Sequence, residues 1–204
     1  MKRITFVTLT MCFLISVLNA QEFKTAFEST SPDKKVKINI NKNNLDIKTY
    51  SGNEVIIKAG GYEPPPERAK GLKPLYNAKS DNTGIGLSVV EKNNVMEITN
   101  ASTQSGIDYT IKIPKDVGLS VNLGFQSDDL SISDFSNELE IDTKTSDINL
   151  KNISGPITAH SISGNITIVF DKLSQQGPSS VTTVSGFVDI TLPGNANADL
   201  SMKS

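Results

Sequence analysis

The sequence has little of what builds a ring-rich or disulfide-linked protein. Its 204 residues include no tryptophan, one cysteine and one histidine, and only 6% are aromatic. A single cysteine, Cys12, excludes an internal disulfide framework and a thiolate metal site, because each requires at least two cysteines. Ile, Val, Leu, Thr, Ser, Asn and Asp are plentiful, a composition that favours strands and turns over helices. The core must therefore be built mainly from aliphatic side chains.

The chain also lacks an excess of positive charge. It contains 20 Lys and Arg against 22 Asp and Glu, and two of the basic residues, Lys2 and Arg3, lie at the extreme N-terminus. Without residues 1–20 the balance is 18 to 22, or about four net negative charges. A nucleic-acid-binding protein normally presents a basic face. We therefore expect no nucleic-acid partner.

Residues 1–20 have the layout of a secretory signal peptide. A short basic start precedes the almost continuously apolar or hydroxylic residues 4–18, and Ala20 supplies a small residue at the expected cleavage point. The apolar run is shorter than the roughly 20 residues of a membrane-spanning helix. Met11 before Cys12 does not fit a lipid-attachment site. The sequence predicts an exported protein, either periplasmic or extracellular at the cell surface, that does not span the membrane.

Between residues 121 and 168 an apolar-x-apolar pair recurs every nine residues. Two apolar residues separated by one polar residue lie on the same face of a β-strand. A polar turn such as Ser154-Gly155 or Ser163-Gly164 closes each unit, and its residues accept turn geometry. The six pairs are Val121/Leu123, Leu130/Ile132, Leu139/Ile141, Ile148/Leu150, Ile157/Ala159 and Ile166/Ile168.

This repeat predicts an all-β fold, a parallel β-solenoid of about nine residues per strand-turn unit. A short strand with one apolar face cannot bury that face alone, but stacked units build a continuous core. At the sixth position, apolar Phe135 and Ile153 alternate with polar Gln126 and Lys144. The alternation indicates about two units per coil and hence a flattened, two-sided β-roll.

The same pattern appears upstream, and we expect one solenoid domain over residues 36–204, preceded by a polar lead at 21–35. The pattern stops in an irregular insertion at 60–86, where a proline and a glycine bracket one expected helical turn, and in a loop insertion at 171–180. Residues 87–98 and 107–113 alternate again and predict longer strands.

Three motifs resemble a known family. They are the stretch Leu45-Asp-Ile-Lys-Thr-Tyr-Ser-Gly-Asn-Glu-Val, the step Ile113-Pro114-Lys115, and the Ser-Gly-x-Ile turns. They are similar to the bacterial "putative adhesin" family, a β-strand-repeat domain of unknown function (family 4097), in its secreted Bacteroidetes-type form. The resemblance covers most of residues 36–204 and implies a right-handed parallel β-helix, the hand expected of parallel crossovers. It carries over no catalytic or binding residue.

Five residues are candidates for catalysis or metal binding. His160 lies beside Ser161, but adjacent residues of an extended chain point apart, so we expect a solvated turn histidine. Asp129, Glu138 and Asp147 share the ninth position of their units, and a two-unit coil would stack Asp129 on Asp147. A calcium site would require about six oxygen ligands. We therefore expect corner carboxylates in solvent, with no catalytic residue, metal or cofactor.

Two classes of function remain open. The favoured one is a non-enzymatic, adhesin-like module that contacts a protein, glycan or cell-surface partner, and the alternative is a polysaccharide-active β-helix enzyme. The insertion, with Tyr62, Arg68, Lys70 and Tyr76, is expected either to make specific contacts or simply to cap the first coil. Leu200-Ser201-Met202 resembles the start of another strand, which predicts an open last coil and self-association through it.

Overall fold

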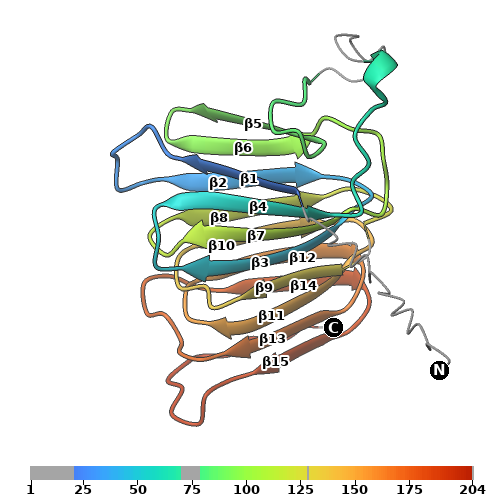
Figure 1. Cartoon of the computed structure of the whole chain (residues 1–204). Helices are drawn as coiled ribbons and strands as arrows, with labels where there is room; N and C mark the ends of the chain where they lie inside the picture. The colour runs from blue at the N-terminus through green and yellow to red at the C-terminus, as the bar shows by residue number, and fades with distance from the viewer. Residues whose placement is uncertain (1–20, 70–78, 128, 204) are drawn as a thin grey trace, which may run out of the picture.

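The computed structural model describes residues 21–69, 79–127 and 129–203, and these residues form two β-sheets that pack face to face (Figure 1). The predicted signal peptide lies outside the described residues. The eight-stranded sheet has the order β1 (Gln21–Ala26), β4 (Glu54–Gly60), β7 (Asp108–Pro114), β3 (Asn44–Tyr50), β9 (Asp129–Ser133), β11 (Asp147–Ile153), β13 (Ile166–Phe170) and β15 (Val188–Thr191). The seven-stranded sheet has the order β14 (Ser180–Ser185), β12 (Ile157–Ser163), β10 (Leu139–Thr143), β8 (Gly118–Leu123), β2 (Lys35–Ile40), β6 (Val95–Asn100) and β5 (Leu87–Lys92).

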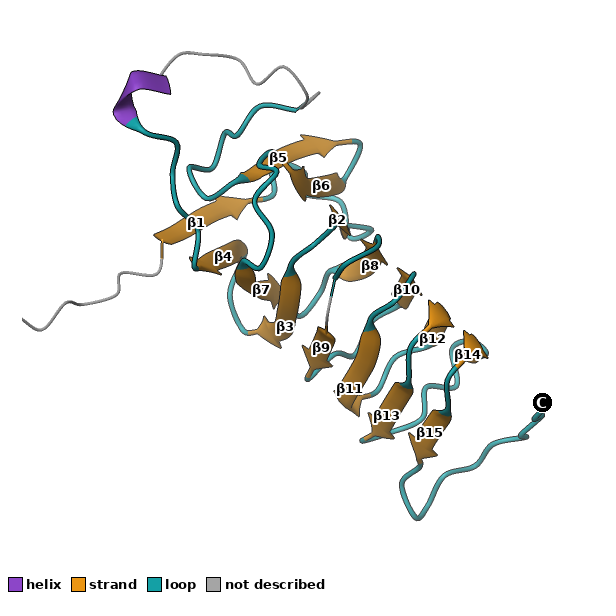
Figure 2. Cartoon of the chain, turned by 90° about the vertical axis from the view of Figure 1, so that its right-hand side faces the viewer, coloured by secondary structure: helices purple, strands orange, loops and turns teal. Residues whose placement is uncertain are grey.

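The apolar pairs of the repeat fill the space between the sheets, as predicted. All twelve residues of the six pairs are buried, and they belong to one continuous core cluster. From β8 to β15 the chain passes alternately from one sheet to the other, so that Figure 2 shows two columns of strands seen nearly end-on. Phe135 and Ile153 are buried at the corners, as the two-unit coil requires.

The parallel strands repeat with a coil of varying length. Leu130 pairs with Ile148 and Ile148 with Ile166, each 18 residues further along. The step is longer from Leu119 to Leu139, and longer again where residues 171–179 form the loop between β13 and β14. The nine-residue unit and the right-handed coil therefore stay predictions for the domain as a whole.

The expectation of an entirely parallel solenoid is wrong at the N-terminal end. Strand β4 pairs antiparallel with both β1 and β7, and β5 pairs antiparallel with β6. Asn93 and Asn94 both have positive φ, at 50° and 64°, and form the two-residue turn between β5 and β6. Such a turn matches the twist of a tight hairpin. The alternating stretch 87–98 is thus two strands.

Stacking order also differs from chain order in this region. Strand β3 lies between β7 and β9, and β2 lies between β6 and β8, so the first coil is sandwiched between later ones. The polar lead 21–35 contributes β1, whose Phe23 packs against the core. Alternation in six residues with a single aromatic gave too weak a signal to predict that strand.

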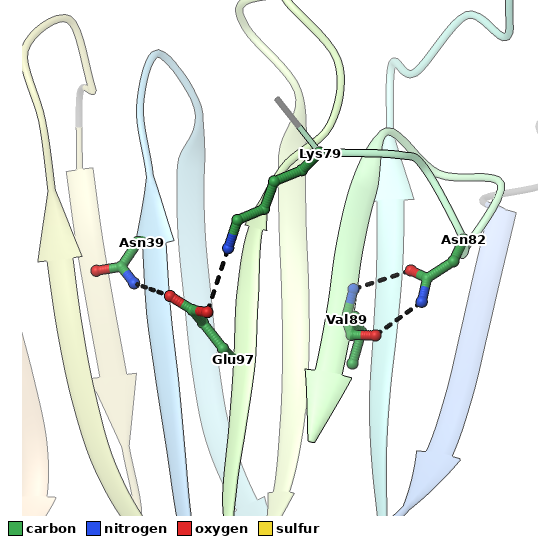
Figure 3. Close-up of polar contacts among 5 residues, drawn as sticks. All are labelled: Asn39, Lys79, Asn82, Val89 and Glu97. Carbon is green, nitrogen blue, oxygen red and sulfur yellow. Dashed lines mark hydrogen bonds and ion pairs between the residues drawn. The ribbon is translucent and has the colours of Figure 1, made fainter. Parts of the chain in front are cut away.

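The insertion covers one end of the seven-stranded sheet. In the described part of it, a 3-10 turn spans Glu67–Ala69 and no strand forms between 61 and 86. Figure 3 shows the side-chain amide of Asn82 bonded to both backbone groups of Val89, accepting from its N–H at 2.9 Å and donating to its C=O at 2.7 Å. Lys79 and Asn39 meet the Glu97 carboxylate on the outer face of that sheet, each at 3.2 Å. The edge of β5 is therefore partly occupied by side chains of the chain itself.

The opposite end is open. Residues 193–203 contain no strand, so the prediction of a strand opening at Leu200-Ser201-Met202 is wrong, and Leu200 is 68% exposed. On β15 the inward-facing Val188 and Ile190 are 40% and 42% exposed, because no further coil lies over them. This end presents the backbone edges of β14 and β15 together with an apolar floor.

Glycine in the Ser-Gly corners is required by the contact between coils. A Cβ on Gly155 would lie 1.9 Å from the backbone oxygen of Asn137, and one on Gly164 would lie 2.2 Å from that of Ser146. Real carbon and oxygen atoms do not approach so closely, and the obstacle is backbone of the preceding coil. The repeated Ser-Gly therefore marks corners that stack directly on one another.

Charged substitutions will distinguish the inward from the outward positions of the strands. Ile157 and Ile166 are buried, whereas Thr158 is exposed and Thr167 lies on the outer face. We expect Ile157→Asp and Ile166→Asp to prevent folding or to lower the free energy of unfolding by several kcal/mol, because the carboxylate would be buried without a partner. Thr158→Asp and Thr167→Asp should cost about 1 kcal/mol or less. Urea denaturation of the four variants tests this, and equal losses would show that the strand register is wrong.

A second pair of substitutions tests the corner contacts. Gly155→Ala and Gly164→Ala should each destabilise the protein by about 1–3 kcal/mol, the usual cost of forcing atoms into a packed site. Gly194→Ala is the matched control, since a Cβ at Gly194 meets nothing within 4 Å. If thermal melts of all three variants coincided with that of the wild type, the coils would not be in contact at these corners.

Candidate functional site

A polar groove of about 620 Å³ runs along one corner of the solenoid. It lies where the strands of the eight-stranded sheet end and the chain turns toward the other sheet. Its size falls in the range of small-molecule sites. The lining residues are Thr49, Tyr50, Ser51, Lys115, Asp134, Phe135, Ser136, Asn152, Ser154 and Asp171.

Contacts between coils hold the groove in shape. Asp134 and Asn152 both have left-handed backbone, at φ values of 59° and 55°, directly after β9 and within β11. Asn152 donates its amide to the Asp134 carboxylate at 3.0 Å, and the Thr49 hydroxyl donates to the Asp134 carbonyl. The N–H of Asp171 donates to the carbonyl of Ile153 at 3.0 Å. Polar side chains of successive coils are thus lined up along the groove.

The side chains that line the groove can form hydrogen bonds with a hydroxyl-rich ligand. It offers hydroxyl, amide and carboxylate groups and the exposed amine of Lys115, which together supply both donors and acceptors. Asp134 and Asp171 are both exposed, and Asn152 lies between them along the groove. No motif in the sequence predicted this site. A signal was present, because Asp134 and Asn152 occupy the same position in units 18 residues apart, and both residue types tolerate left-handed backbone.

The structure separates the candidate pair His160 and Ser161. Ser161 is completely buried between the sheets, and His160 points to the outer face of β12. The two side chains are on opposite faces of one strand, as predicted. The expectation of a solvated turn histidine is wrong, because His160 lies within β12 and is partly buried. Ser161 is therefore inaccessible to a substrate.

The candidate carboxylates do stack as predicted, since Asp129 pairs in register with Asp147. Asp147 accepts hydrogen bonds from the backbone and the side chain of Asn165, at 2.7 and 3.4 Å. Glu138 lies directly before β10 of the seven-stranded sheet, and its carboxylate forms an ion pair with Lys35 at 3.6 Å. Among the described residues, no group of three or more Asp, Glu, His or Cys is arranged to hold a metal ion.

The insertion residues have structural contacts where they are described. The Tyr62 hydroxyl donates to Asp81 at 3.2 Å, and burial, with the nearby Asp81 carboxylate, raises the pKa of Tyr62 to about 12. Burial opposes ionisation of Asp81, but hydrogen bonds from the N–H groups of Thr83, Gly86 and Gly84 outweigh it and lower the pKa of Asp81 below its ordinary value. This network anchors the segment that covers β5. Arg68 is exposed, and Lys70 and Tyr76 lie outside the described residues.

The comparisons with known proteins define the family. The model of the Toastrack DUF4097 family matches residues 19–204, so the chain belongs to that family. One solved structure that resembles the chain is described as a "putative cell adhesion protein" from Clostridium sporogenes. It is 11% identical, the match covers 84% of this chain and 99% of the other, and the TM-score is 0.48. The comparison with curated proteins found no match.

The described segments also bear on the membrane. None of the helical structure in residues 21–69, 79–127 or 129–203 is long and apolar enough to cross a bilayer.

Proposed function

We propose that the protein is an exported, non-enzymatic β-repeat module that binds a protein, glycan or other partner at the cell envelope or cell surface, in the manner of an adhesin. The corner groove is the observation that carries the proposal. It is large enough for a ligand, it is lined mainly by polar groups, and contacts between coils hold those groups in place. The signal-peptide layout of residues 1–20 supports export.

The alternative is a polysaccharide-active enzyme, and the two groove carboxylates favour it. Glycosidases use a pair of carboxyl groups on either side of the scissile bond. Asp134 and Asp171 could be such a pair. Against this reading, both side chains are exposed, whereas the acid of such a pair normally lies in an environment that disfavours its charge. Asp134 is also engaged by Asn152.

A glycan panel with product analysis separates the two functions. We expect the purified protein to bind at least one envelope glycan without releasing fragments. Ser136→Trp should abolish binding, because the exposed Ser136 lines the groove and an indole there would fill it. Ser163→Trp places the same side chain at an exposed position on the opposite corner and should leave binding intact. Fragments that disappear in Asp134→Asn or Asp171→Asn would establish the enzyme instead.

We further propose that the open end associates with the same end of a second copy. Exposed Val184, Phe187, Val188 and Ile190 gather at this end, beside the free backbone edges of β14 and β15. The other end of the seven-stranded sheet is less suited to pairing, since Asn82 occupies part of the β5 edge. A tail-to-tail dimer would therefore bury the apolar floor and pair the open edges.

Light scattering on the purified protein tests this association. We expect dimers or larger species, and Ile190→Lys should shift them toward monomer because it places a charge in the apolar floor. Thr182→Lys is the control, as Thr182 lies on the outer face of β14. A strictly monomeric wild-type protein at high concentration would show that the open end is not an interface.

A further inference from the structure

Lysine side chains form a row on the outer face of the eight-stranded sheet, beside the corner groove. Strand pairing places Lys112 of β7 directly opposite Lys48 of β3. On one side of this pair, Ile56 of β4 lies opposite Lys112 and also opposite Lys24 of β1. On the other side, Ser133 of β9 lies opposite Lys48 and also opposite Lys151 of β11. Adjacent strands are about 4.8 Å apart, so the four lysines span roughly 24 Å along the stacking direction.

The charge of this row is largely uncompensated. Like charges directly opposite one another in a sheet destabilise it, and Lys48 and Lys112 are both partly buried in that arrangement. Lys24 pairs with Glu22 at 2.7 Å. Across the segments that the structure describes, Lys48, Lys112 and Lys151 have no such pair. An anionic ligand in front of them would remove the repulsion.

The row is only one residue wide, which limits the shape of an anionic partner. Two residues toward the amino ends of the parallel strands, or roughly 6.6 Å away, the neighbouring row contains Glu22, Asp46 and Asp189. Its one lysine, Lys58, forms an ion pair with Glu22 at 3.3 Å. A flat anionic surface would meet these carboxylates as well as the lysines. A single extended chain could follow the lysines alone.

The groove lies on the other side of the lysine row. Thr49, Asp134 and Asn152 follow directly after Lys48, Ser133 and Lys151 in the chain, so the groove begins where the lysine row ends. Lys115 adds a further exposed amine inside the groove. The combined surface offers cations in a line and, along one side of that line, hydroxyl and amide groups suited to sugar hydroxyls.

We propose that this surface binds a linear polysaccharide that carries a carboxylate on most of its sugars, a uronic-acid polymer. Its carboxylates lie over Lys112, Lys48 and Lys151, and the hydroxyls on one side of its chain face the groove. The inference rests on the proposed binding function and specifies the class of ligand. It follows from the match between a narrow cationic row and a narrow anionic chain.

Calorimetric titration of the purified protein with polygalacturonate tests the proposal, with the fully methyl-esterified polymer as its uncharged counterpart. The acidic polymer should bind and the ester should not, and the affinity should fall as salt screens the charges. Lys48→Gln/Lys112→Gln should weaken binding about tenfold. Lys37→Gln/Lys92→Gln makes the same charge change at exposed positions of the seven-stranded sheet and should bind as the wild type does.

Thermal melts show whether weaker binding by the Lys48/Lys112 variant results from a less stable fold. Because Lys48→Gln/Lys112→Gln removes a like-charge contact, its melting temperature should equal or exceed that of the wild type. Polygalacturonate should raise the melting temperature of the wild type and that of the Lys37/Lys92 control, and should raise that of the Lys48/Lys112 variant less.

Other results would overturn the inference in distinguishable ways. Equal loss of affinity in the two double variants would mean that net charge, and not the row, attracts the polymer. Tighter binding of single-stranded DNA or of anionic phospholipid vesicles would assign the row to another class of partner. If the ester bound as well as the acid and Ser136→Trp blocked both, the lysine inference would fail while the groove function stood. If no glycan bound at all, the lysine inference would fail, and the proposed function would be restricted to a protein or other non-glycan partner.

Discussion

Backbone pairing between successive coils is the constraint on which the rest of the structure depends. Because each parallel strand pairs in register with the strand of the next coil, every side chain lies over its counterpart one coil away. Inward, this places Leu130, Ile148 and Ile166 in one column of the core. Outward, the same register places Lys48 against Lys112 and Asp129 against Asp147, whether or not their charges agree. Attractive packing inside and repulsive rows outside therefore have one cause.

Two kinds of site follow from this arrangement. Corners, where the backbone is free of the ladder, can collect side chains that accept left-handed geometry, and the groove at Asp134 and Asn152 is built in this way. Sheet faces instead present straight rows with a spacing set by the strands. A ligand that is itself a linear polymer with a regular repeat fits such rows better than a compact molecule does. The fold of this chain thus provides long outer surfaces on which side chains of similar chemistry repeat from strand to strand.

The two ends of the solenoid differ in how far their edge strands are covered by other parts of the chain. At one end, side chains of Asn82 and Thr83 bond backbone groups of β5, and the Asp81 network holds the covering segment in place. At the other, β14 and β15 keep open edges over an apolar floor. A repeat fold needs a cap or a partner wherever its stacking stops. Within the described residues, the seven-stranded sheet therefore has one covered edge, at β5, and one exposed edge, at β14, and the proposed association rests on this asymmetry.

The sequence by itself determined the all-β class, the inward and outward positions of the repeat, and the Ser-Gly corners, because each depends on residues within one or two units. It also separated His160 from Ser161, since alternation along a strand is a local property. Only the tertiary structure decided that β2 and β3 lie between later strands, that β4 runs antiparallel, and that Lys48 faces Lys112 from 64 residues away. Those pairings join segments that the insertion separates along the chain. The nine-residue repeat does not continue through the insertion, so it cannot fix which residues of these segments pair. The order of the strands there is fixed by which edges and apolar faces remain to be covered, and that is a property of the whole fold.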